Sequence, residues 1–258
     1  MNVLVSQKVK LGLPDGLLWR QDKVSVPYWR VYWNDAPGAF VKDAAGEIEL
    51  GPGLVAAIPP RTVYSTRTTG CSTHFYAHFT ASQPFETIMP GIIALDAERL
   101  LALAASIARD FHLDSPPDLK AMLKVHIYLY ELLLAIPDCK LPSEKKLDPR
   151  IEMAAAILDA NPSLTLDQLA MELKMSRSVF LELFHRETGS APQRLSRRRR
   201  LEKACMLLHY SDKSIKQIAE ETGFCDRYHF SRLFKREFSY GPAEFRSQMD
   251  AYKHQQRQ

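Results

Sequence analysis

Apolar and polar residues alternate along the first part of the chain, with the period of two that is typical of β-strands. Residues 28–33 place two tryptophans and a valine on one face of a strand, and two tyrosines and Arg30 on the other. Residues 71–80 alternate in the same way, and turns rich in proline and glycine separate such segments at about ten-residue spacing. The pattern predicts a β-sandwich or barrel of short strands in residues 1–92.

The period changes to that of an α-helix after these strands. Asp96 is the predicted N-cap of a first helix that continues to Phe111, with Leu95 and Leu100 spaced as a hydrophobic staple. Residues 115–118 resemble a capping box with proline at the first helical position, and they predict a second helix up to residue 136.

The second predicted helix is apolar on two sides. One stripe consists of Leu119, Met122, Leu123, Ile127, Tyr130, Leu133 and Leu134, and the other of Val125, Leu129, Leu132 and Ile136. A helix that is apolar on most sides must be buried on most sides, and the strand domain can cover only one stripe. We therefore expect residues 93–136 to form a helical dimerisation segment of a homodimer, with a purely internal core helix as the alternative.

A linker is predicted over residues 137–148, which contain two prolines, several charged residues and few apolar ones. Asp148 and Pro149 then supply an N-cap and a first-turn proline for a new helix, which opens a C-terminal domain over residues 149–258.

The C-terminal domain contains an internal repeat with an offset of about 50 residues. Gln168-Leu169-Ala170 aligns with Gln217-Ile218-Ala219, and the matched pairs further on are Phe180 and Phe230, Phe184 and Phe234, Arg186-Glu187 and Arg236-Glu237, and Pro192 and Pro242. Each copy begins with a capping box, at Thr165 or Ser214, and continues through a tight turn to a second helix that opens at Ser176 or Asp226. This order predicts two helix-turn-helix units.

The second helix of each unit has a face that points away from the core. The apolar stripes are Phe180, Leu183 and Phe184 in the first copy and Phe230, Leu233 and Phe234 in the second. Arginine pairs with guanine and glutamate with cytosine in the major groove, whereas further cations and helix N-termini hold phosphates. The predicted base-reading residues are Arg177, Ser178, Glu182, Arg227, Tyr228, Ser231 and Arg232, and the predicted phosphate contacts are Thr165, His185, Arg198, Ser214 and Lys235. The first copy is the weaker reader, because Glu182 repels phosphates.

Net charge supports a polyanionic partner for the C-terminal domain. Residues 1–148 carry 15 Lys and Arg against 16 Asp and Glu, whereas residues 149–258 carry 19 against 14. The densest basic run is Arg197 to Arg200.

From Arg150 to Met249 the chain resembles the AraC family of bacterial transcription regulators. The family's C-terminal signature stands here as Ile218-Ala219, Gly223-Phe224, Phe230-Ser231-Arg232, Phe234-Lys235, Pro242 and Phe245-Arg246. The resemblance implies two helix-turn-helix units joined by a long helix, about Pro192 to Tyr210, which place two recognition helices in successive major grooves of double-stranded DNA. RNA polymerase is then a candidate partner. Lys174 and Ser239 stand where the family usually has glycine, so we expect local strain or a shifted turn there.

The N-terminal part resembles, more loosely, the cupin-like sensor domain of that family. Residues 51–60 look like part of the second cupin motif, but Tyr64 stands where a metal-binding cupin usually has histidine. His74 and His78 are four residues apart on a predicted strand, about 13 Å, too far to share one metal ion. Aromatic walls with a few polar groups suit a small-molecule site, so the ligand-binding candidates are Trp29, Trp33, His74, Tyr76 and His78. The alternative is that these residues are sandwich core.

Three functions are compatible with this two-domain α+β chain to different degrees. A DNA-binding regulator controlled by a small-molecule effector accounts for most features, and a regulator whose N-terminal domain only dimerises or binds a partner protein is the alternative. A metal-dependent cupin enzyme is disfavoured, and we expect no enzyme activity, cofactor or metal. The four cysteines lack metal or disulfide spacing, and no apolar run of about 18 residues or signal-peptide pattern occurs, which favours a cytoplasmic protein without membrane contact.

Overall fold

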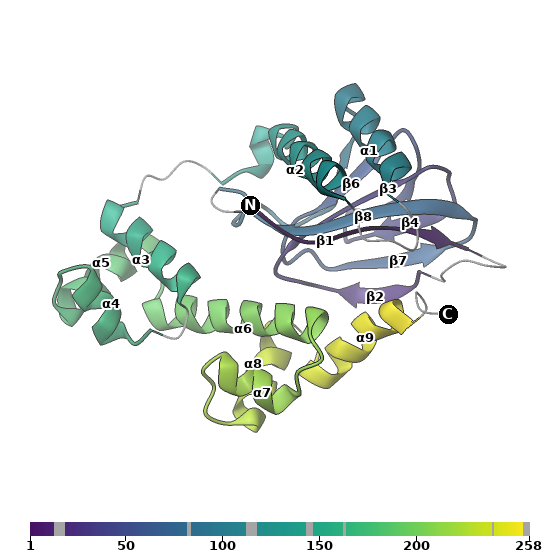
Figure 1. The fold of residues 1–258 in the computed structure, drawn as a ribbon. Coiled ribbons are helices and arrows are strands. Elements are labelled where there is room, and N and C mark those ends of the chain that lie inside the picture. The colour runs from purple at the N-terminus through teal and green to yellow at the C-terminus, as the bar shows by residue number, and fades with distance from the viewer. Residues whose placement is uncertain are drawn as a thin grey trace. The chain divides into compact units, whose positions relative to one another are not determined.

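The computed structural model describes residues 1–12, 19–81, 84–111, 118–142, 147–161, 164–238 and 240–254 (Figure 1). The chain divides into two compact units, Met1–Ser143 and Glu144–Asp250, and their boundary falls within the segment predicted to be a linker. The first unit combines strands with two α-helices and the second is helical, so the α+β class is confirmed.

Two antiparallel sheets form the N-terminal unit. The strands are β1 (Asn2–Leu11), β2 (Gln21–Val24), β3 (Trp29–Asn34), β4 (Ala39–Lys42), β5 (Glu47–Leu50), β6 (Val55–Ile58), β7 (Tyr64–Thr68), β8 (Ser72–Thr80) and β9 (Ile93–Leu95). The strand order is β1-β8-β3-β6-β9 in the first sheet and β2-β7-β4-β5 in the second. The strands predicted over residues 28–33 and 71–80 are therefore confirmed, as β3 and β8.

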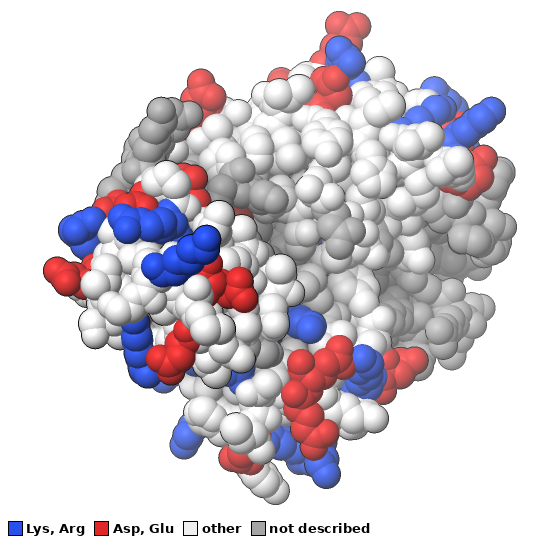
Figure 2. Space-filling view, turned by 60° about the vertical axis from the view of Figure 1, so that its left-hand side comes forward, with Lys and Arg blue, Asp and Glu red and all other residues white. Residues whose placement is uncertain are grey.

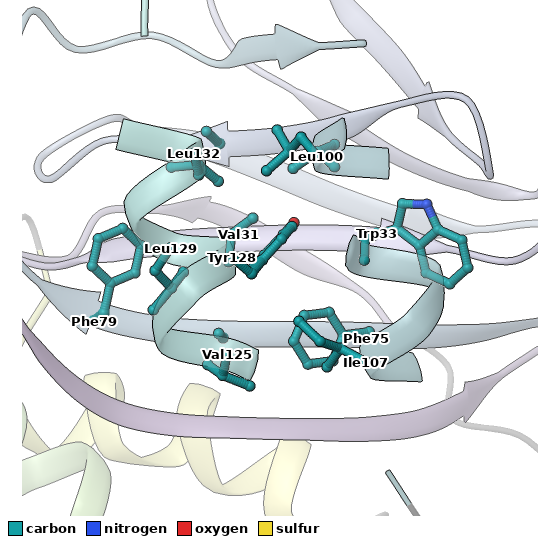
Figure 3. Close-up of a cluster of buried hydrophobic side chains, with 14 of the residues drawn as sticks. Val31, Trp33, Phe75, Phe79, Leu100, Ile107, Val125, Tyr128, Leu129 and Leu132 are labelled. Carbon is teal, nitrogen blue, oxygen red and sulfur yellow. The ribbon is translucent and has the colours of Figure 1, made fainter. Parts of the chain in front are cut away.

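The pairing of β3 with β8 gives the first sheet two different faces. Trp29 lies opposite Phe79 and Trp33 opposite Phe75, so one face is aromatic and apolar. This face packs against α1 (Glu98–Asp110) and α2 (Leu119–Leu134), and Figure 3 shows side chains of both strands and both helices meeting in one cluster. Burial of these large side chains is the main stabilising contribution to the unit.

The two helices begin later than the sequence predicts. The N-cap of α1 is Ala97, which makes no side-chain cap bond, so the prediction of Asp96 was wrong by one residue. Strand β9 runs to Leu95 and the connection to α1 takes two further residues, which leaves Asp96 outside the helix. Helix α2 begins after Asp118, whose carboxylate accepts a bond from Ala121 N at 2.7 Å. The predicted capping residues 115–117 lie outside the described residues.

Helices build the C-terminal unit. They are α3 (Pro149–Ala160), α4 (Leu166–Glu172), α5 (Arg177–Thr188), α6 (Pro192–Tyr210), α7 (Ile215–Glu221), α8 (Arg227–Phe238) and α9 (Pro242–His254). Asp148 caps α3, with Pro149 in its first turn, and both predicted capping boxes form at the starts of α4 and α7. The long helix that the family resemblance implies between the two helix-turn-helix units is α6, and it has the expected bounds.

The turn of the first helix-turn-helix unit is strained at Lys174. Its φ is +53°, the left-handed conformation in which glycine is favoured, and the second unit has Gly223 at φ +77° in its turn. The turn is therefore not shifted: Lys174 adopts the backbone of the missing glycine. Ser239, the other departure from the expected pattern, lies outside the described residues.

Candidate nucleic-acid interface

Helices α5 and α8 are held by buried aromatic anchors that leave one helix face exposed. Phe180, Leu183 and Phe184 are buried in the first unit, and Phe230, Leu233 and Phe234 in the second. The Ser176 side chain accepts from Val179 N at the start of α5, and the Asp226 carboxylate accepts from Tyr228 N and His229 N at the start of α8. Because each start is capped, the residues just inside it project from a rigid backbone.

The exposed face of α8 is cationic. Arg227, Tyr228, Arg232 and Lys235 are exposed, with Tyr228 at 77%. The Arg227 guanidinium lies over the Tyr228 ring, 5.6 Å from its centre. Ser231 is half-buried, and its hydroxyl donates to the Arg227 carbonyl at 2.9 Å. The predicted base-reading residues of the second unit thus lie together on one surface, with Ser231 the least available.

The exposed face of α5 carries less free positive charge. Arg177 Nη1 donates to the Asp167 carboxylate at 3.1 Å, which ties this side chain back to α4. Ser178, Glu182 and His185 are exposed on the same helix. At the position of Arg232 the first unit therefore has the carboxylate of Glu182, and its Arg177, which corresponds to Arg227, is paired with Asp167.

The two predicted phosphate-binding hydroxyls are also capping groups. Ser214 Oγ accepts from Gln217 N, and Thr165 Oγ1 accepts from Gln168 N, each at 3.2 Å. Both residues are exposed, so a phosphate contact at these helix N-termini is sterically open. Their role toward DNA stays a prediction.

The basic run on α6 is largely engaged within the protein. Arg198 and Arg199 both pair with Glu202, at 3.0 and 2.9 Å, and Arg199 is 12% exposed. Arg200 donates to backbone carbonyls of the turn between α7 and α8. The sequence missed these contacts, although Glu202 stands three and four residues after Arg199 and Arg198, the spacing of helical ion pairs. Figure 2 shows basic and acidic side chains side by side on the described part of the face in view.

The five ligand-binding candidates lie on opposite faces of the first sheet. Trp29 and Trp33 belong to the helix-covered apolar cluster, where their indole N–H groups donate to the carbonyls of Phe85 and Pro52. His74, Tyr76 and His78 occupy the other face of β8, where Asn34, Tyr32 and Arg30 of β3 lie opposite them in register. One site formed by all five residues is therefore excluded by the strand geometry.

The second face of this sheet is unusually polar for a sandwich interior. Arg30 is 1% exposed, and its guanidinium donates to the hydroxyls of Tyr28, Tyr32 and Tyr64. Burial lowers the pKa of Arg30, but the neighbouring tyrosines raise it further, so the net direction is upward. The alternation of residues 28–33 already placed Arg30 opposite the tryptophans, which was the signal for this cluster.

His74 is held as a neutral imidazole on this polar face. Burial lowers its pKa to about 3. The Asn34 side-chain amide donates to Ser72 Oγ at 2.7 Å, so its oxygen accepts from His74 Nδ1 at 2.7 Å. Nε2 then carries a lone pair, and it forms no hydrogen bond with any described residue. This buried acceptor suits a donor group of a ligand.

Helix α2 leaves an apolar stripe uncovered among the described residues. Val125, Leu129 and Leu132 are fully buried against the sheet. The exposed side chains on the opposite side are Leu119, Leu123, Ile127, Tyr130 and Leu134, at 50–80%. Of the predicted outer stripe, Leu133 is buried and Met122 half-buried, so this stripe is narrower than the sequence indicated.

The described residues contain neither a cluster of metal-ligating side chains nor a membrane-spanning helix. No three His, Cys, Asp or Glu side chains in this part of the chain gather closely enough to hold a metal ion. None of the described helices has the length and apolar character to cross a bilayer.

The chain is similar to known proteins in two ways. Residues 169–248 match the family model described as a helix-turn-helix domain. The HTH-type transcriptional activator RhaS of Escherichia fergusonii is 31% identical over 160 residues, which are 61% of this chain and 58% of the relative. RhaS of an Enterobacter species is 47% identical over 78 residues, 29% of this chain and 28% of the relative. The aligned parts thus span about half or less of these relatives.

Solved structures show the same fold along nearly the whole chain. ToxT of Vibrio cholerae, bound to a methylnaphthalenyl butenoic acid, superposes with a TM-score of 0.55 at 12% identity and covers 96% of this chain and 100% of ToxT. A ToxT structure with a bound unsaturated fatty acid gives 0.50 at 13% identity and covers 94% of both chains.

Proposed function

We propose that the chain is a transcription regulator of the AraC family, which binds double-stranded DNA sequence-specifically and activates transcription. The observation that carries the proposal is the exposed cationic face of a capped α8, within a duplicated helix-turn-helix unit. Arg232 and Arg227 are placed to donate to guanine, and Lys235 to the DNA backbone. RNA polymerase is the partner that activation requires.

Helix α6 has a length that suits two adjacent grooves. It has 19 residues, so at 1.5 Å per residue it is about 28 Å long. Successive major grooves on one face of DNA lie about 34 Å apart. The two recognition helices can therefore address neighbouring grooves, with some bending of the DNA.

Selection from a random duplex pool with the full-length chain tests this proposal. We expect a motif of two half-sites about one helical turn apart, and binding that weakens steeply with added salt. Enrichment of a single half-site restricts base reading to one unit. If no sequence is enriched over the starting pool, sequence-specific binding is refuted.

A small-molecule effector is the second part of the proposal. It would bind between the two sheets, against His74, Tyr76 and His78 and beside Arg30, which sequence analysis did not include. The neutral His74 acceptor and the buried guanidinium supply one group that accepts and one that donates hydrogen bonds. The bound acids named for ToxT, which shares the fold, support a ligand in this class of protein.

Thermal unfolding measures effector binding, because a ligand of the native state raises the midpoint by mass action. An unsaturated fatty acid and a panel of hydroxylated metabolites are the first probes. We expect one of them to raise the midpoint, His74→Gln to remove the shift, and Trp33→Phe, on the opposite face, to retain it. If no probe shifts the midpoint, the N-terminal unit is better described as a module for dimerisation or partner binding.

A homodimer through α2 completes the proposal. The five exposed apolar side chains of α2 would be covered by α2 of a second copy of the chain. Sedimentation should show a dimer that Leu123→Lys with Ile127→Lys converts to a folded monomer, whereas Lys120→Ala leaves the dimer intact. A wild-type monomer at micromolar concentration would contradict this assignment.

A further inference from the structure

Arg200 connects α6 to the turn of the second helix-turn-helix unit. Its Nε donates to the Thr222 carbonyl at 2.6 Å, and its Nη2 donates to the Gly223 carbonyl. The guanidinium also lies over the Phe224 ring, 4.2 Å from its centre. These acceptors end α7 and begin the turn into α8, so one planar side chain satisfies two carbonyls and packs on the residue that follows.

The turn itself is fixed from its other side by backbone bonds. Gly223 N donates to the Glu220 carbonyl at 3.0 Å, and Phe224 N to the Ala219 carbonyl at 2.8 Å. Phe224 continues into the aromatic core through Phe230, 5.2 Å away between ring centres. The Arg200 contacts are therefore continuous, through the turn, with the buried side of the recognition helix.

The first helix-turn-helix unit uses the equivalent arginine differently. At an offset of 50 residues, Ile151, Ala154 and Leu158 of α3 match Leu201, Ala204 and Leu208 of α6, and Arg150 matches Arg200. Arg150 Nε and Nη2 donate to its own N-cap, Asp148, at 2.9 and 2.6 Å. Among the described residues, no hydrogen bond joins Arg150 to the turn that contains Lys174, so this arginine clamp is a feature of the second unit.

We propose that Arg200 is a positioning residue for DNA reading, which holds the turn between α7 and α8 against α6 and so sets the direction in which α8 enters the major groove. The inference rests on the proposed function. Arg200, the last residue of the basic run, thus acts through a contact within the protein and not through a contact with DNA. Arg198 and Arg199 of the same run are likewise bound within the protein, to Glu202.

The chemistry of the contact makes lysine a sharp test. A guanidinium donates two parallel bonds from a fixed plane and stacks on an aromatic ring, whereas an ammonium group is a single point that cannot do both. Arg200→Lys keeps the charge and most of the side-chain length. Arg197→Met is the matched control, since it removes a charge from the same run at a residue with no hydrogen bond or ion pair among the described residues.

Binding of the full-length variants is measured on the duplex selected by the wild-type chain and on a random duplex, across a salt series. For Arg200→Lys we expect about tenfold weaker binding to the selected duplex, little change on the random duplex, and an unchanged salt slope, because no phosphate contact is lost. Arg197→Met should change the affinity for both duplexes by the same factor. An unchanged ratio between the two duplexes for Arg200→Lys would overturn the proposal.

Amide hydrogen exchange without DNA gives an independent readout. Residues 222–226 should exchange faster in Arg200→Lys than in the wild type or in Arg197→Met, while exchange in α3 to α5 stays unchanged. Equal exchange at the turn would show that Arg200 does not hold it. Failure of the proposed function would be seen in a different experiment, the selection from random duplexes, in which the wild-type chain would then enrich no sequence.

Discussion

The two helix-turn-helix units have the same fold but opposite charge balance. Residues 149–190 carry four Lys and Arg against six Asp and Glu, residues 212–254 carry eight against seven, and residues 191–211 carry six against one. The basic character of the C-terminal domain thus resides mainly in α6. Most of the arginine run in α6 is engaged within the protein, so total charge is a poor guide to which surface meets DNA.

The two helix-turn-helix units also differ in how many contacts hold the recognition helix in place. Phe234 of α8 contacts the rings of Phe230, Phe238 and Phe245, whereas Phe184 of α5 contacts that of Phe180. The second unit also has a glycine in its turn and the Arg200 clamp. A rigid, cationic second unit and a looser, acidic first unit predict that base reading is concentrated in α8.

The largest difference should follow truncation of the matched anchors. Phe234→Ala is expected to lower the free energy of unfolding by about 3–5 kcal/mol through lost burial and a cavity. Phe184→Ala should cost less, because fewer aromatic rings surround it. Urea unfolding of the two full-length variants measures both values. Equal losses would show that the aromatic cluster does not make the second unit firmer.

Arginine removal from the second reading face should have the next largest effect. Arg232→Ala is expected to weaken binding to the selected duplex by about 1–3 kcal/mol and to relax the preference at one base pair. Lys235→Ala should weaken binding to every sequence similarly, and Glu182→Ala should weaken it least. Titrations on the selected duplex and its single-base variants test this order. A larger specificity loss for Glu182→Ala would transfer the main reading role to the first unit.

The strained turn of the first unit offers a gain in stability. Lys174→Gly relieves a left-handed conformation, at the cost of a more flexible unfolded chain, and should stabilise the unit by up to about 1 kcal/mol. Gly223→Ala, at the corresponding turn of the second unit, should be destabilising. Thermal midpoints of the two variants decide the matter, and a drop for Lys174→Gly would mean that the lysine side chain compensates the strain.

The sequence predicted the C-terminal fold well because its signals are local. Capping boxes at Thr165 and Ser214, an N-cap at Asp148 and matched aromatic anchors each act within one helix or one repeat, and all of them are present. The engagement of Arg198 to Arg200 was missed. The identity of a charged residue on a helix does not show whether a partner from the next turn, or from another helix, has already bound it.

The N-terminal candidate site was predicted less well because two strand faces are involved. Alternation assigned Trp29 and Trp33 to one face of β3 and Arg30 to the other, but the pairing of β8 that places His74 and His78 on the Arg30 face is a long-range fact. Without knowledge of that register, the tryptophans of β3 and the histidines of β8 were placed in one candidate site, although they lie on opposite faces of the sheet. The packing of the two sheets also brings Tyr64 of β7 to Arg30, which no local pattern indicates.

The smallest expected difference lies in the two caps of the recognition helices. Hydrogen bonds from Tyr228 N and His229 N lower the pKa of Asp226 from its ordinary value of 3.8, whereas the Ser176 cap carries no charge. A carboxylate with a lowered pKa in the folded state contributes stability that is complete above its unfolded pKa and is lost as pH falls through the folded value. The α8 cap should therefore weaken only in acid, below about pH 4, whereas the α5 cap is indifferent to pH. Asp226→Asn keeps a cap acceptor without the charge, so thermal midpoints of this variant and of the wild type should differ less at pH 3 than at pH 6. A constant difference over that range would show that the charge of Asp226 does not contribute to the cap.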